Sequence, residues 1–462
     1  MTLRTAFTVV GALLWSGCVI DVSPCGPTNC NGCCNADGVC MSGVLAQSCG
    51  SRGTTCATCA ASQVCESSRC AVATGGGTAT GGGAATGGGA GGGAGGGAAT
   101  GGGAGAASCQ NGVKDGTETD VDCGGDCAMK CRVYSGCSVE TDCEARTTCE
   151  RAVCLPGVWT TATPMPVPRG NPASIVAGDT LYVMGGLDGQ LDPTATVYRY
   201  TMSTRSWSTG ASFPEPRQQA SGAVLPDGRV VLVGGASDAD DGGLGSRVDL
   251  YDPRTNTWSP GVPLPSPRTG ACTVALANGD LLVIGGYEFD DANSKRSVAR
   301  LRADSGVWAE FPNVLLTARS VPWCHMQADG GVLLAGGVTT GTSYCTTSAE
   351  VLNTNTLTTS SVDDLPVHQA VGAGGLTSNG RAWMLGGWGC SISARSGQPT
   401  AAAWLYLPSA NMWASATSLP IGLSGAASAL LPDGTFFVTA GFKPGQFILP
   451  EPVDTSFVFT PY

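Results

Sequence analysis

Basic residues are scarce in this chain of 462 residues. Lys and Arg number 24 against 35 Asp and Glu, so the formal net charge is -11. No cluster of basic side chains is placed to follow a phosphate backbone, which argues against a nucleic-acid partner. A basic amphipathic stretch is missing too, so nothing predicts direct docking on a membrane surface.

Long apolar runs and strong helix formers are also rare. The one apolar run, residues 6–15, follows Arg4 and has about ten residues, which suits the core of a signal peptide and is too short to span a bilayer. The chain instead holds 70 Gly and 27 Pro with few Lys and Glu. This composition favours short strands and turns and predicts almost no helix.

The apolar run ends in Leu14-Trp15-Ser16-Gly17-Cys18, which resembles the lipobox of bacterial lipoproteins. In that class, small residues precede a Cys that is lipidated and becomes the new N-terminus. Trp15 departs from the pattern, because an aliphatic residue is usual there. We expect residues 1–17 to be a signal peptide and the exported protein to be anchored through Cys18, at the outer membrane or cell surface. The alternative is an ordinary secretory signal with a structural Cys18.

The remaining cysteines fall into three groups, each with an even number of members: Cys25 to Cys70, Cys109 to Cys154, and Cys272, Cys324, Cys345 and Cys390. Even counts in compact segments outside a reducing compartment predict disulfide frameworks. A zinc or redox role for Cys56 and Cys59 is the alternative, and the export signal argues against it. We therefore expect two Cys-rich modules, over residues 18–70 and 108–156.

The segment 71–107 between these modules consists almost wholly of Gly, Ala and Thr. It cannot bury enough apolar surface to offset the entropy of ordering it, so the sequence predicts a flexible, disordered linker. As a Gly-rich coil it would have a root-mean-square reach of about 35 Å.

The second module begins with an acidic stretch that resembles the Cys-rich repeats of large extracellular proteins of Gram-negative bacteria. Its carboxylates could hold calcium through oxygen ligands. The alternative is a solvated acidic stretch that forms turns. The four candidate ligands are Asp115, Glu118, Asp120 and Asp122.

The rest of the chain repeats itself with a period of roughly 50 residues. Gly pairs follow short apolar runs at Gly185-Gly186, Gly234-Gly235, Gly285-Gly286, Gly336-Gly337 and Gly386-Gly387, with a degenerate Ala440-Gly441. A second series keeps the same phase: Trp207, Trp258, Trp308 and Trp413, with Leu357 near the missing fourth position. Two independent markers with one period indicate a repeated structural unit.

A strand that ends in Gly-Gly, a Tyr-bearing strand such as Val248-Asp-Leu-Tyr251-Asp and a following Trp258 identify the unit as resembling the kelch repeat. The resemblance covers residues 157–462 and implies an all-β, six-bladed β-propeller of four-stranded blades. Trp159 has no preceding Gly pair, and the last repeat has no Trp strand after Phe457. We therefore expect the strand around Trp159 to complete the sixth blade and close the ring.

One face of this propeller is expected to carry all the long connections, including the segment that contains Trp388, and binding residues usually lie on such loops. The connections that lead into the inner strands emerge on the same face, and a basic residue recurs in them at equivalent positions. In kelch propellers that bind acidic peptides, Arg at this position often lines the pocket, and the alternative is a structural role between blades. The candidate ligand-binding residues are Arg169, Arg217, Arg268, Arg319, His368 and Trp388.

The four propeller cysteines are expected to pair across adjacent blades, Cys272 with Cys324 and Cys345 with Cys390. The first two stand at nearly equivalent places before their Gly pairs, and the last two follow Gly pairs in facing loops.

Two classes of function remain at this point. The first is a surface-anchored, monomeric module that binds an extracellular protein or glycan, or mediates adhesion, with no cofactor. The second is a carbohydrate-active kelch enzyme, either of the galactose-oxidase type or a sugar epimerase or mutarotase. The chain has only His325 and His368, whereas the galactose-oxidase type holds copper with two His and two Tyr. Hydrolase motifs are absent as well, so we expect a binder.

Overall fold

The computed structural model describes residues 109–110, 114, 116–237, 244–288, 293–339, 345–391, 396–445 and 450–462. It also gives the backbone of seven short strands in the first Cys-rich module. These are β1 (Cys33–Cys34), β2 (Cys40–Met41), β3 (Val44–Leu45), β4 (Ser48–Cys49), β5 (Thr54–Thr55), β6 (Gln63–Glu66) and β7 (Arg69–Val72). The signal peptide, Cys18, the pairing of Cys25 to Cys70 and the linker lie outside the described residues. The chain divides into two units, residues 17–107 and residues 1–16 with 108–462.

The second unit is built from strands. The helical elements among its described residues are two 3-10 turns, η1 (Glu140–Asp142) and η2 (Leu244–Ser246). In the part of the chain that the structure describes, we find no helix with the length and apolarity needed to cross a bilayer. The composition therefore predicted the all-β class correctly.

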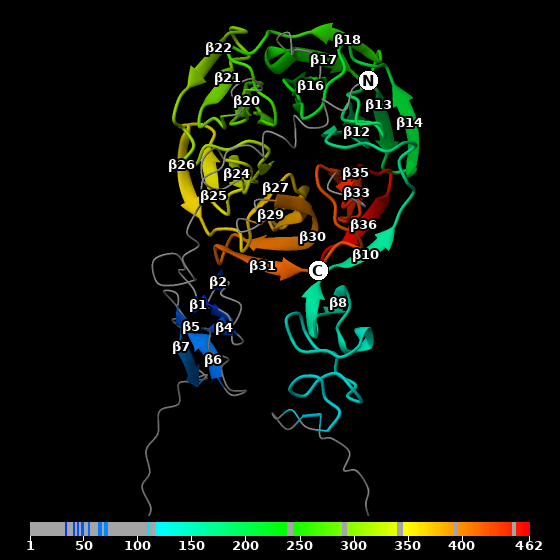
Figure 1. Cartoon of the computed structure of the whole chain (residues 1–462), viewed down its shortest axis with the longest axis vertical. Coiled ribbons are helices and arrows are strands. Elements are labelled where there is room, and N and C mark those ends of the chain that lie inside the picture. The colour runs from blue at the N-terminus through cyan, green and yellow to red at the C-terminus, as the bar shows by residue number, and fades with distance from the viewer. Residues whose placement is uncertain are drawn as a thin grey trace, which may run out of the picture. The chain divides into compact units, whose positions relative to one another are not determined.

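Six antiparallel sheets surround one axis as the blades of a propeller (Figure 1). The first three blades are β11 (Ala173–Ala177), β12 (Thr180–Met184), β13 (Val197–Thr201) and β14 (Ser206–Gly210); β15 (Ser221–Val224), β16 (Val230–Val233), β17 (Val248–Asp252) and β18 (Thr257–Pro260); and β19 (Cys272–Ala275), β20 (Leu281–Ile284), β21 (Val298–Leu301) and β22 (Trp308–Phe311).

Blade 4 contains β23 (Trp323–Met326), β24 (Gly331–Ala335), β25 (Ala349–Asn353) and β26 (Thr358–Val362). Blade 5 contains β27 (Gln369–Ala370), β28 (Ala373–Leu376), β29 (Ala382–Ser391), β30 (Ser396–Leu407) and β31 (Met412–Ala416). Blade 6 contains β32 (Ala427–Leu430), β33 (Phe436–Thr439), β36 (Ser456–Thr460) and β10 (Val158–Thr161), and it carries the small hairpin β34 (Phe442–Lys443) and β35 (Glu451–Pro452).

Blade 6 joins the two ends of the propeller, as the unmatched Trp159 predicted. Strand β10 pairs with β36 in antiparallel register, with Trp159 opposite Phe459 and Thr161 opposite Phe457. Figure 1 shows β10 beside the red C-terminal strand. The Trp159 ring lies 4.7 Å from the Phe459 ring, and its indole N–H donates to the carbonyl of Thr417 in the connection that follows blade 5.

The tryptophan series serves the contacts between blades. Each indole N–H donates to a backbone carbonyl of the connection that precedes its blade: Trp207 to Thr163, Trp258 to Ala211, Trp308 to Val262 and Trp413 to Asp363. Blade 4 lacks the Trp. Leu357, the expected substitute, lies in a turn, and Thr359 takes the position and donates through Oγ1 to Val314 O at 2.8 Å.

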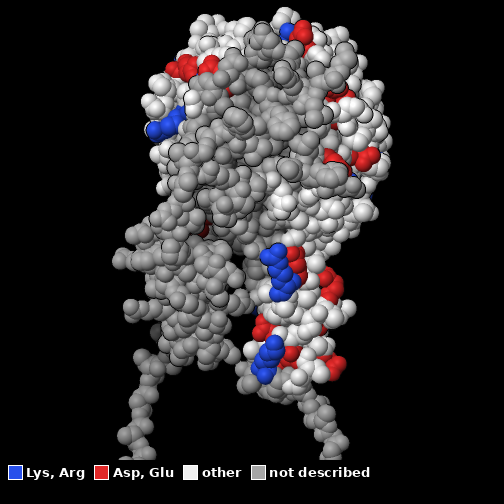
Figure 2. Space-filling view, viewed as in Figure 1, with Lys and Arg blue, Asp and Glu red and all other residues white. Residues whose placement is uncertain are grey.

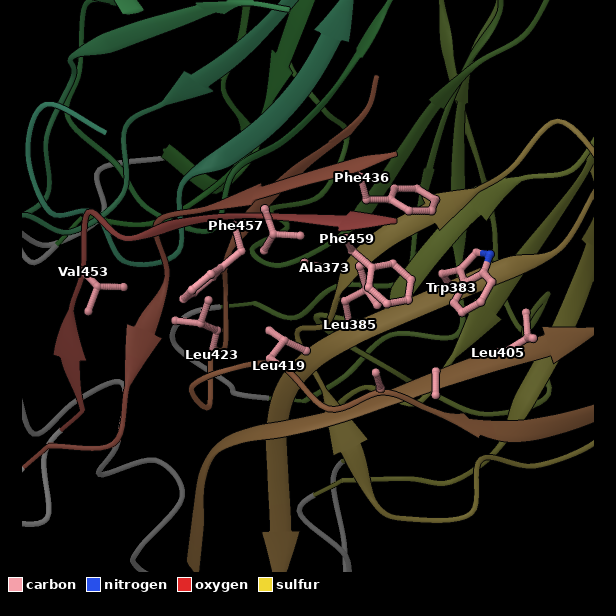
Figure 3. Close-up of a cluster of buried hydrophobic side chains, with 13 residues drawn as sticks. Ala373, Trp383, Leu385, Leu405, Leu419, Leu423, Phe436, Val453, Phe457 and Phe459 are labelled. Carbon is pink, nitrogen blue, oxygen red and sulfur yellow. The ribbon is translucent and has the colours of Figure 1, made fainter. Parts of the chain in front are cut away.

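The hydrophobic core is divided into clusters between successive blades. The cluster between blades 5 and 6 contains Trp383 and Leu385 from β29 and Phe436, Phe457 and Phe459 from the closing blade, all buried. Figure 3 shows the Phe459 ring beside Trp383 and Leu385, with Phe436 and Phe457 farther along the same cluster. Closing the ring therefore buries apolar surface on both sides of the last blade.

The Gly pairs permit a close approach between neighbouring blades. Gly234 has φ +61°, and a Cβ there would stand 2.0 Å from the carbonyl oxygen of Arg268 in the next blade. The φ value and the missing side chain are both required, so the repeated Gly is a packing residue.

The second Cys-rich module is fully cross-linked. Its eight cysteines form Cys109–Cys127, Cys123–Cys131, Cys137–Cys149 and Cys143–Cys154. The hairpin β8 (Thr147–Glu150) and β9 (Val153–Pro156) leads directly into β10. The two expected propeller disulfides, Cys272–Cys324 and Cys345–Cys390, are also confirmed.

This module packs against the propeller. The Glu150 carboxylate accepts hydrogen bonds from Ser418 N and Ser418 Oγ at 2.8 and 2.6 Å. Thr417 Oγ1 donates to Gly157 O, and the C-terminal Tyr462 hydroxyl donates to Glu144 Oε1 at 2.7 Å. The module and the propeller therefore form one packed unit and not two separately linked domains.

Candidate binding surface

The repeated arginines stand at equivalent positions, one at the entry to each of the first four inner strands. Their exposed fractions are 5% for Arg169, 1% for Arg217 and Arg268, and 0% for Arg319. The guanidinium groups of the last three therefore lie inside the blades and not in an open mouth, and ligand binding by these residues stays a prediction.

Each of these three guanidinium groups has a carboxylate partner in its own blade. Arg217 contacts Asp249 at 2.6 Å, Arg268 contacts Glu310 at 2.7 Å, and Arg319 contacts Glu350 at 2.6 Å. Glu350 is itself 1% exposed. A buried ion pair of this kind loses several kcal/mol if one member is removed, since the other charge stays behind in a medium of low polarity.

The arginines also connect neighbouring blades. The carbonyl of Arg319 accepts a hydrogen bond from Gly286 N of blade 3 at 2.9 Å. Its Nη1 donates to Gly336 O of its own blade at 2.7 Å and to Ser348 O at 2.9 Å. Arg268 repeats the pattern with Gly235, Gly285 and Ser297. These contacts fit the alternative interpretation of the arginine series, which is a structural role between blades.

His368 is not the fifth member of this series. Gln369 is, because its carbonyl accepts from Gly337 N at 3.0 Å and its side-chain amide donates to Gly386 O. His368 lies one residue earlier, half-buried, with Nδ1 2.8 Å from Cys345 O. The sixth position is Leu423, whose carbonyl accepts from Gly387 N.

The residue opposite this position changes together with it. The equivalent place on the third strand of each blade is Tyr198, Asp249, Ala299, Glu350, Trp404 or Phe457. Asp249 and Glu350 face arginines, Trp404 donates its indole N–H to Gln369 at 2.9 Å, and Phe457 shares an apolar cluster with Leu423. Where Ala299 stands, Glu310 of the outer strand supplies the charge instead.

Arg169 faces Tyr198 and differs from the other arginines. Its guanidinium carbon lies 5.5 Å from the Tyr198 ring centroid. Nη2 donates to Thr196 Oγ1 at 2.8 Å and Nη1 to Pro168 O at 2.9 Å. Nε is buried without a hydrogen-bond partner, as it is in the other three arginines. Burial lowers the pKa of this guanidinium from its ordinary value.

Trp388 lies on a strand and not on an open loop, because β29 and β30 extend beyond the blade as a hairpin. It pairs with Pro399, and its indole ring packs over Gly397. Trp388 is half-buried. The Cys345–Cys390 disulfide joins this hairpin to the neighbouring blade, so the hairpin is held in place on the face of the long connections.

A ring of backbone surrounds the channel on this face. Two residues after each entry position, one residue per blade has positive φ: Asn171, Gln219, Gly270, Val321, Val371 and Gly425. In five of these six residues the backbone N–H donates to the carbonyl of the equivalent residue in the preceding blade. Examples are Gly270 to Gln219 at 2.9 Å and Val321 to Gly270 at 2.6 Å. Positive φ is unfavourable for a β-branched residue such as Val321, so the ring maintains a strained backbone.

This ring narrows the channel. Residues joined by such a bond have Cα atoms about 5 Å apart, so six of them form a circle about 10 Å across before the atoms' own radii are subtracted. Beside it, Tyr287 donates its hydroxyl to Gln219 Oε1 at 3.0 Å, and burial raises the pKa of Tyr287 to about 12.

His325 lies on the inner strand β23 with its ring centroid 4.6 Å from that of Trp323. Burial lowers the pKa of His325 to about 4, so it is neutral at neutral pH. Among the described residues, neither histidine belongs to a group of side chains close enough to share a metal ion.

The acidic stretch of the second module is engaged with its own backbone. Asp120 accepts from Val121 N at 2.8 Å and from Gly136 N at 2.6 Å, and the buried Glu118 accepts from Asp122 N at 3.3 Å. Asp115 lies outside the described residues, and calcium binding stays a prediction. Figure 2 shows acidic and basic side chains mixed over the visible surface of this module.

Comparison with known proteins agrees with this geometry. Residues 157–337 match the model of the KLHDC2/KLHL20/DRC7 Kelch-repeats domain. The propeller is a kelch-repeat domain. A solved structure titled "Structure of YjhT" superposes with a TM-score of 0.54 at 18% identity, covering 65% of this chain and 97% of that one. This likeness supports the six-bladed kelch fold alone.

Curated relatives match shorter stretches. Kelch-like protein terF of Aspergillus terreus is 30% identical over 164 residues, which cover 34% of this chain and 36% of that protein. The F-box/kelch-repeat protein At1g67480 of Arabidopsis thaliana is 35% identical over 147 residues, 31% of this chain and 38% of its own. N-acetylneuraminate epimerase 1 of Escherichia coli is 24% identical over 217 residues, 39% of this chain and 58% of its own. The chain thus spans about a third of the first two relatives.

Proposed function

We propose that this protein is a tethered binding module whose kelch propeller engages a protein partner through the face of its long connections. The observation that carries the proposal is the division of the propeller into two unlike faces on one closed ring. One face has short turns such as that around Gly228, while the other has the β29–β30 hairpin, the β34–β35 hairpin and the half-buried aromatic residues Tyr287 and Trp388. Aromatic side chains beside loops on a rigid scaffold suit protein recognition.

A photo-crosslinking amino acid tests which face is used. Gln190 lies on the long-connection face and Asn379 on the short-turn face, and both side chains are exposed. We expect the crosslinker at Gln190 to capture a partner on the surface of the producing cell, in competition with added soluble propeller. The same group at Asn379 should capture nothing that the propeller displaces. Equal capture from both positions would reject the assignment of the face.

The tether is proposed to be a lipid on Cys18, supported by the lipobox resemblance of Leu14 to Cys18. Cys18→Ser should release the protein into the medium, or leave it soluble after cell fractionation. Metabolic labelling with a fatty-acid analogue should mark the parent and not the variant. Retention of the variant in the membrane fraction would contradict the anchor.

A second candidate function follows from the likeness to N-acetylneuraminate epimerase 1. On this reading the protein would act on a sugar at the same face. The proton spectrum of N-acetylneuraminate mixed with the protein measures this directly, because an epimerase speeds the exchange between anomers. An exchange rate equal to that of buffer alone removes this candidate without affecting the binding proposal.

A further inference from the structure

Blade 4 has a hollow on the face of the short turns, where the other five blades carry a side chain. The position lies at the start of the second strand, five residues before the Gly pair, and in blade 4 it is Gly331. Its counterparts in the other blades are Thr180, Arg229, Asp280, Arg381 and Thr435. The φ of Gly331 is not positive, so the backbone there does not require a glycine.

Blade 3 shows how this space is filled elsewhere. There Asp280 Oδ2 accepts two hydrogen bonds from the guanidinium of Arg300, at 2.8 and 2.6 Å. In blade 4, Val351 holds the place of Arg300 as the third residue of its strand. Blade 4 thus lacks this ion pair and has a hollow of about 290 Å³ between β24, β25 and β26 (Figure 1). Small-molecule sites begin at about 300 Å³, so the hollow suits a small ligand.

The walls of the hollow are two turns that hydrogen bonds hold together. Asp329 Oδ1 accepts from Gly331 N at 2.9 Å and so fixes the turn between β23 and β24. The buried Thr354 donates its hydroxyl to Gly330 O at 2.8 Å, which joins this turn to the one between β25 and β26. Because the protein itself makes these bonds, the hollow is formed before a ligand binds.

Two polar groups that line the hollow keep hydrogen-bonding capacity. Asp329 has a second carboxylate oxygen, Oδ2, which can only accept. Asn353 uses its Oδ1 to accept from Asn355 N at 3.0 Å, and its Nδ2 can only donate. In the part of the chain that the structure describes, neither Oδ2 nor Nδ2 has a partner. Ser360 on β26 adds a hydroxyl group, which can do both.

The turn carboxylate is compensated in the two other blades that have one. Asp227 Oδ2 of blade 2 accepts from Arg229 Nε at 2.8 Å, and Asp433 Oδ2 of blade 6 lies 3.4 Å from Arg205 Nη2. Arg229 stands at the position that Gly331 has in blade 4. The glycine therefore opens the space and also removes the cation that would pair with the neighbouring acid.

We propose that this hollow binds a single sugar unit, a neutral compound rich in hydroxyl groups. Each sugar hydroxyl can both donate and accept, so adjacent hydroxyls satisfy the carboxylate of Asp329 and the amide of Asn353 together. Val351 offers an apolar wall for the C–H groups of the ring. The site lies on the face opposite the one used in the proposed function, so the inference goes beyond that function.

Other classes of small ligand fit the hollow less well. An anion would be repelled by the Asp329 carboxylate. A calcium ion takes about six to eight oxygen ligands, several of them carboxylates. Among the described residues, Asp329 belongs to no group of side chains close enough to share a metal ion.

Methyl glycosides of glucose, galactose, mannose and N-acetylglucosamine are the probes for this site. Saturation-transfer-difference NMR with the full chain measures their binding, and we expect a saturable signal from at least one. Gly331→Thr restores the side chain that blades 1 and 6 carry, so it fills the hollow and should abolish the signal. The absence of a saturable signal from all four probes, or an equal signal in Gly331→Thr, overturns the proposal.

Asp329→Asn removes the charge and preserves the turn, because Asn278 at the same place in blade 3 accepts from Asp280 N at 3.1 Å. Binding should weaken about tenfold, which is the loss expected for one hydrogen bond to a charged group. Asn379→Asp makes the reverse exchange in the equivalent turn of blade 5 and should leave binding unchanged. Equal effects of the two variants would count against the site.

Amide NMR signals of the parent protein guard against poor folding of the variants. The bound glycoside should shift the N–H signals of Gly331 and Asn355 and leave that of Gly228, in the turn of blade 2, in place. Equal shifts in the two turns reject the proposal.

The sugar site and the protein-binding face can fail separately. If a glycoside binds at Gly331 but the crosslinker at Gln190 captures no partner, the sugar site holds and the protein-binding role falls. If Gln190 captures a partner and none of the glycosides binds, the protein-binding role holds and the sugar site falls. A free glycoside forms no crosslinked protein at Asn379, so the two tests do not interfere.

Discussion

Three of the four buried entry arginines of this propeller have a carboxylate partner. The Arg319–Glu350 pair is as enclosed as the Arg217–Asp249 pair, with both side chains at 1% exposure or less. Glu350→Gln leaves the guanidinium without its counter-ion, so we expect the free energy of unfolding to fall by about 3–5 kcal/mol. Denaturant titration measures it.

The matched control is the exposed pair of Arg205 and Asp433, whose side chains are 62% and 49% exposed. Asp433→Asn should change the free energy of unfolding by less than about 1 kcal/mol. Equal losses in the two variants would show that burial does not decide the value of the pair.

The pH dependence of stability should depend on His325. Its pKa in the folded protein is about 4, below the value of about 6.5 for an unfolded chain. Between these two values the unfolded state binds a proton that the folded state does not, so stability falls as the pH is lowered from 6.5 toward 4. The loss from this group should reach at most about 3 kcal/mol.

His325→Gln should flatten the stability curve between pH 7 and pH 5 relative to the parent. His368→Gln is the control, as His368 is the second of the two histidines of the chain and is half-buried at a blade entry. If both variants keep the slope of the parent, the acid sensitivity arises elsewhere.

The sequence predicted individual residues less well than it predicted the repeat. Spacing alone placed the fifth entry residue at His368, one position before Gln369, because a one-residue difference in a period of about 50 carries no signal of its own. The acids that neutralise the arginines come from third and outer strands, at Asp249, Glu310 and Glu350, so no fixed interval relates them. Only paired positions across strands reveal them.

The strands and hairpins were predicted from the sequence more accurately than the individual residues were. The Gly and Trp series predicted six blades and the closure of the last, because each marker has a packing role that recurs with the repeat. The segment after Trp388 was expected to be a loop and forms the ends of β29 and β30. Its Gly and Ser residues suggested a loop, but backbone pairing across the hairpin extends the sheet.

Strand β10 should be needed for the stability of the whole propeller. Deletion of residues 157–163 removes the outer strand of blade 6 and exposes the edge of β36. We expect a cooperative loss of stability, seen as a lower thermal midpoint for the entire propeller. Trp159→Ala, a smaller change, should cost about 3 kcal/mol. Val307→Ala, at a residue 60% exposed, is the control and should cost almost nothing.

The Cys345–Cys390 disulfide should act locally. Replacing both residues by Ser releases the hairpin from the neighbouring blade, and we expect faster amide hydrogen exchange around Trp388 with little change in the core strands. The corresponding change at Cys272 and Cys324, which joins two inner strands, should lower global stability by about 2–4 kcal/mol. The opposite distribution of effects would refute the local role.

At the scale of the whole molecule, the second Cys-rich module and the propeller should unfold as one unit. Glu150→Ala with Thr417→Val removes the hydrogen bonds that these two side chains make between them. Calorimetry should record one transition in the parent and a second, separate transition in the double variant. Lys114→Ala, in the same module at a residue without contact to these groups, should leave one transition. Two transitions in the parent would disprove the coupling.

The pairing of β10 with β36 also sets the order of events during synthesis. Among the propeller strands, β10 leaves the ribosome first and its partner β36 leaves it last. At the usual rates of translation the first strand waits for tens of seconds without a neighbour. The toroid can therefore close only after β36 has been made, and a product that stops before this strand would leave an open ring with two unpaired strand edges.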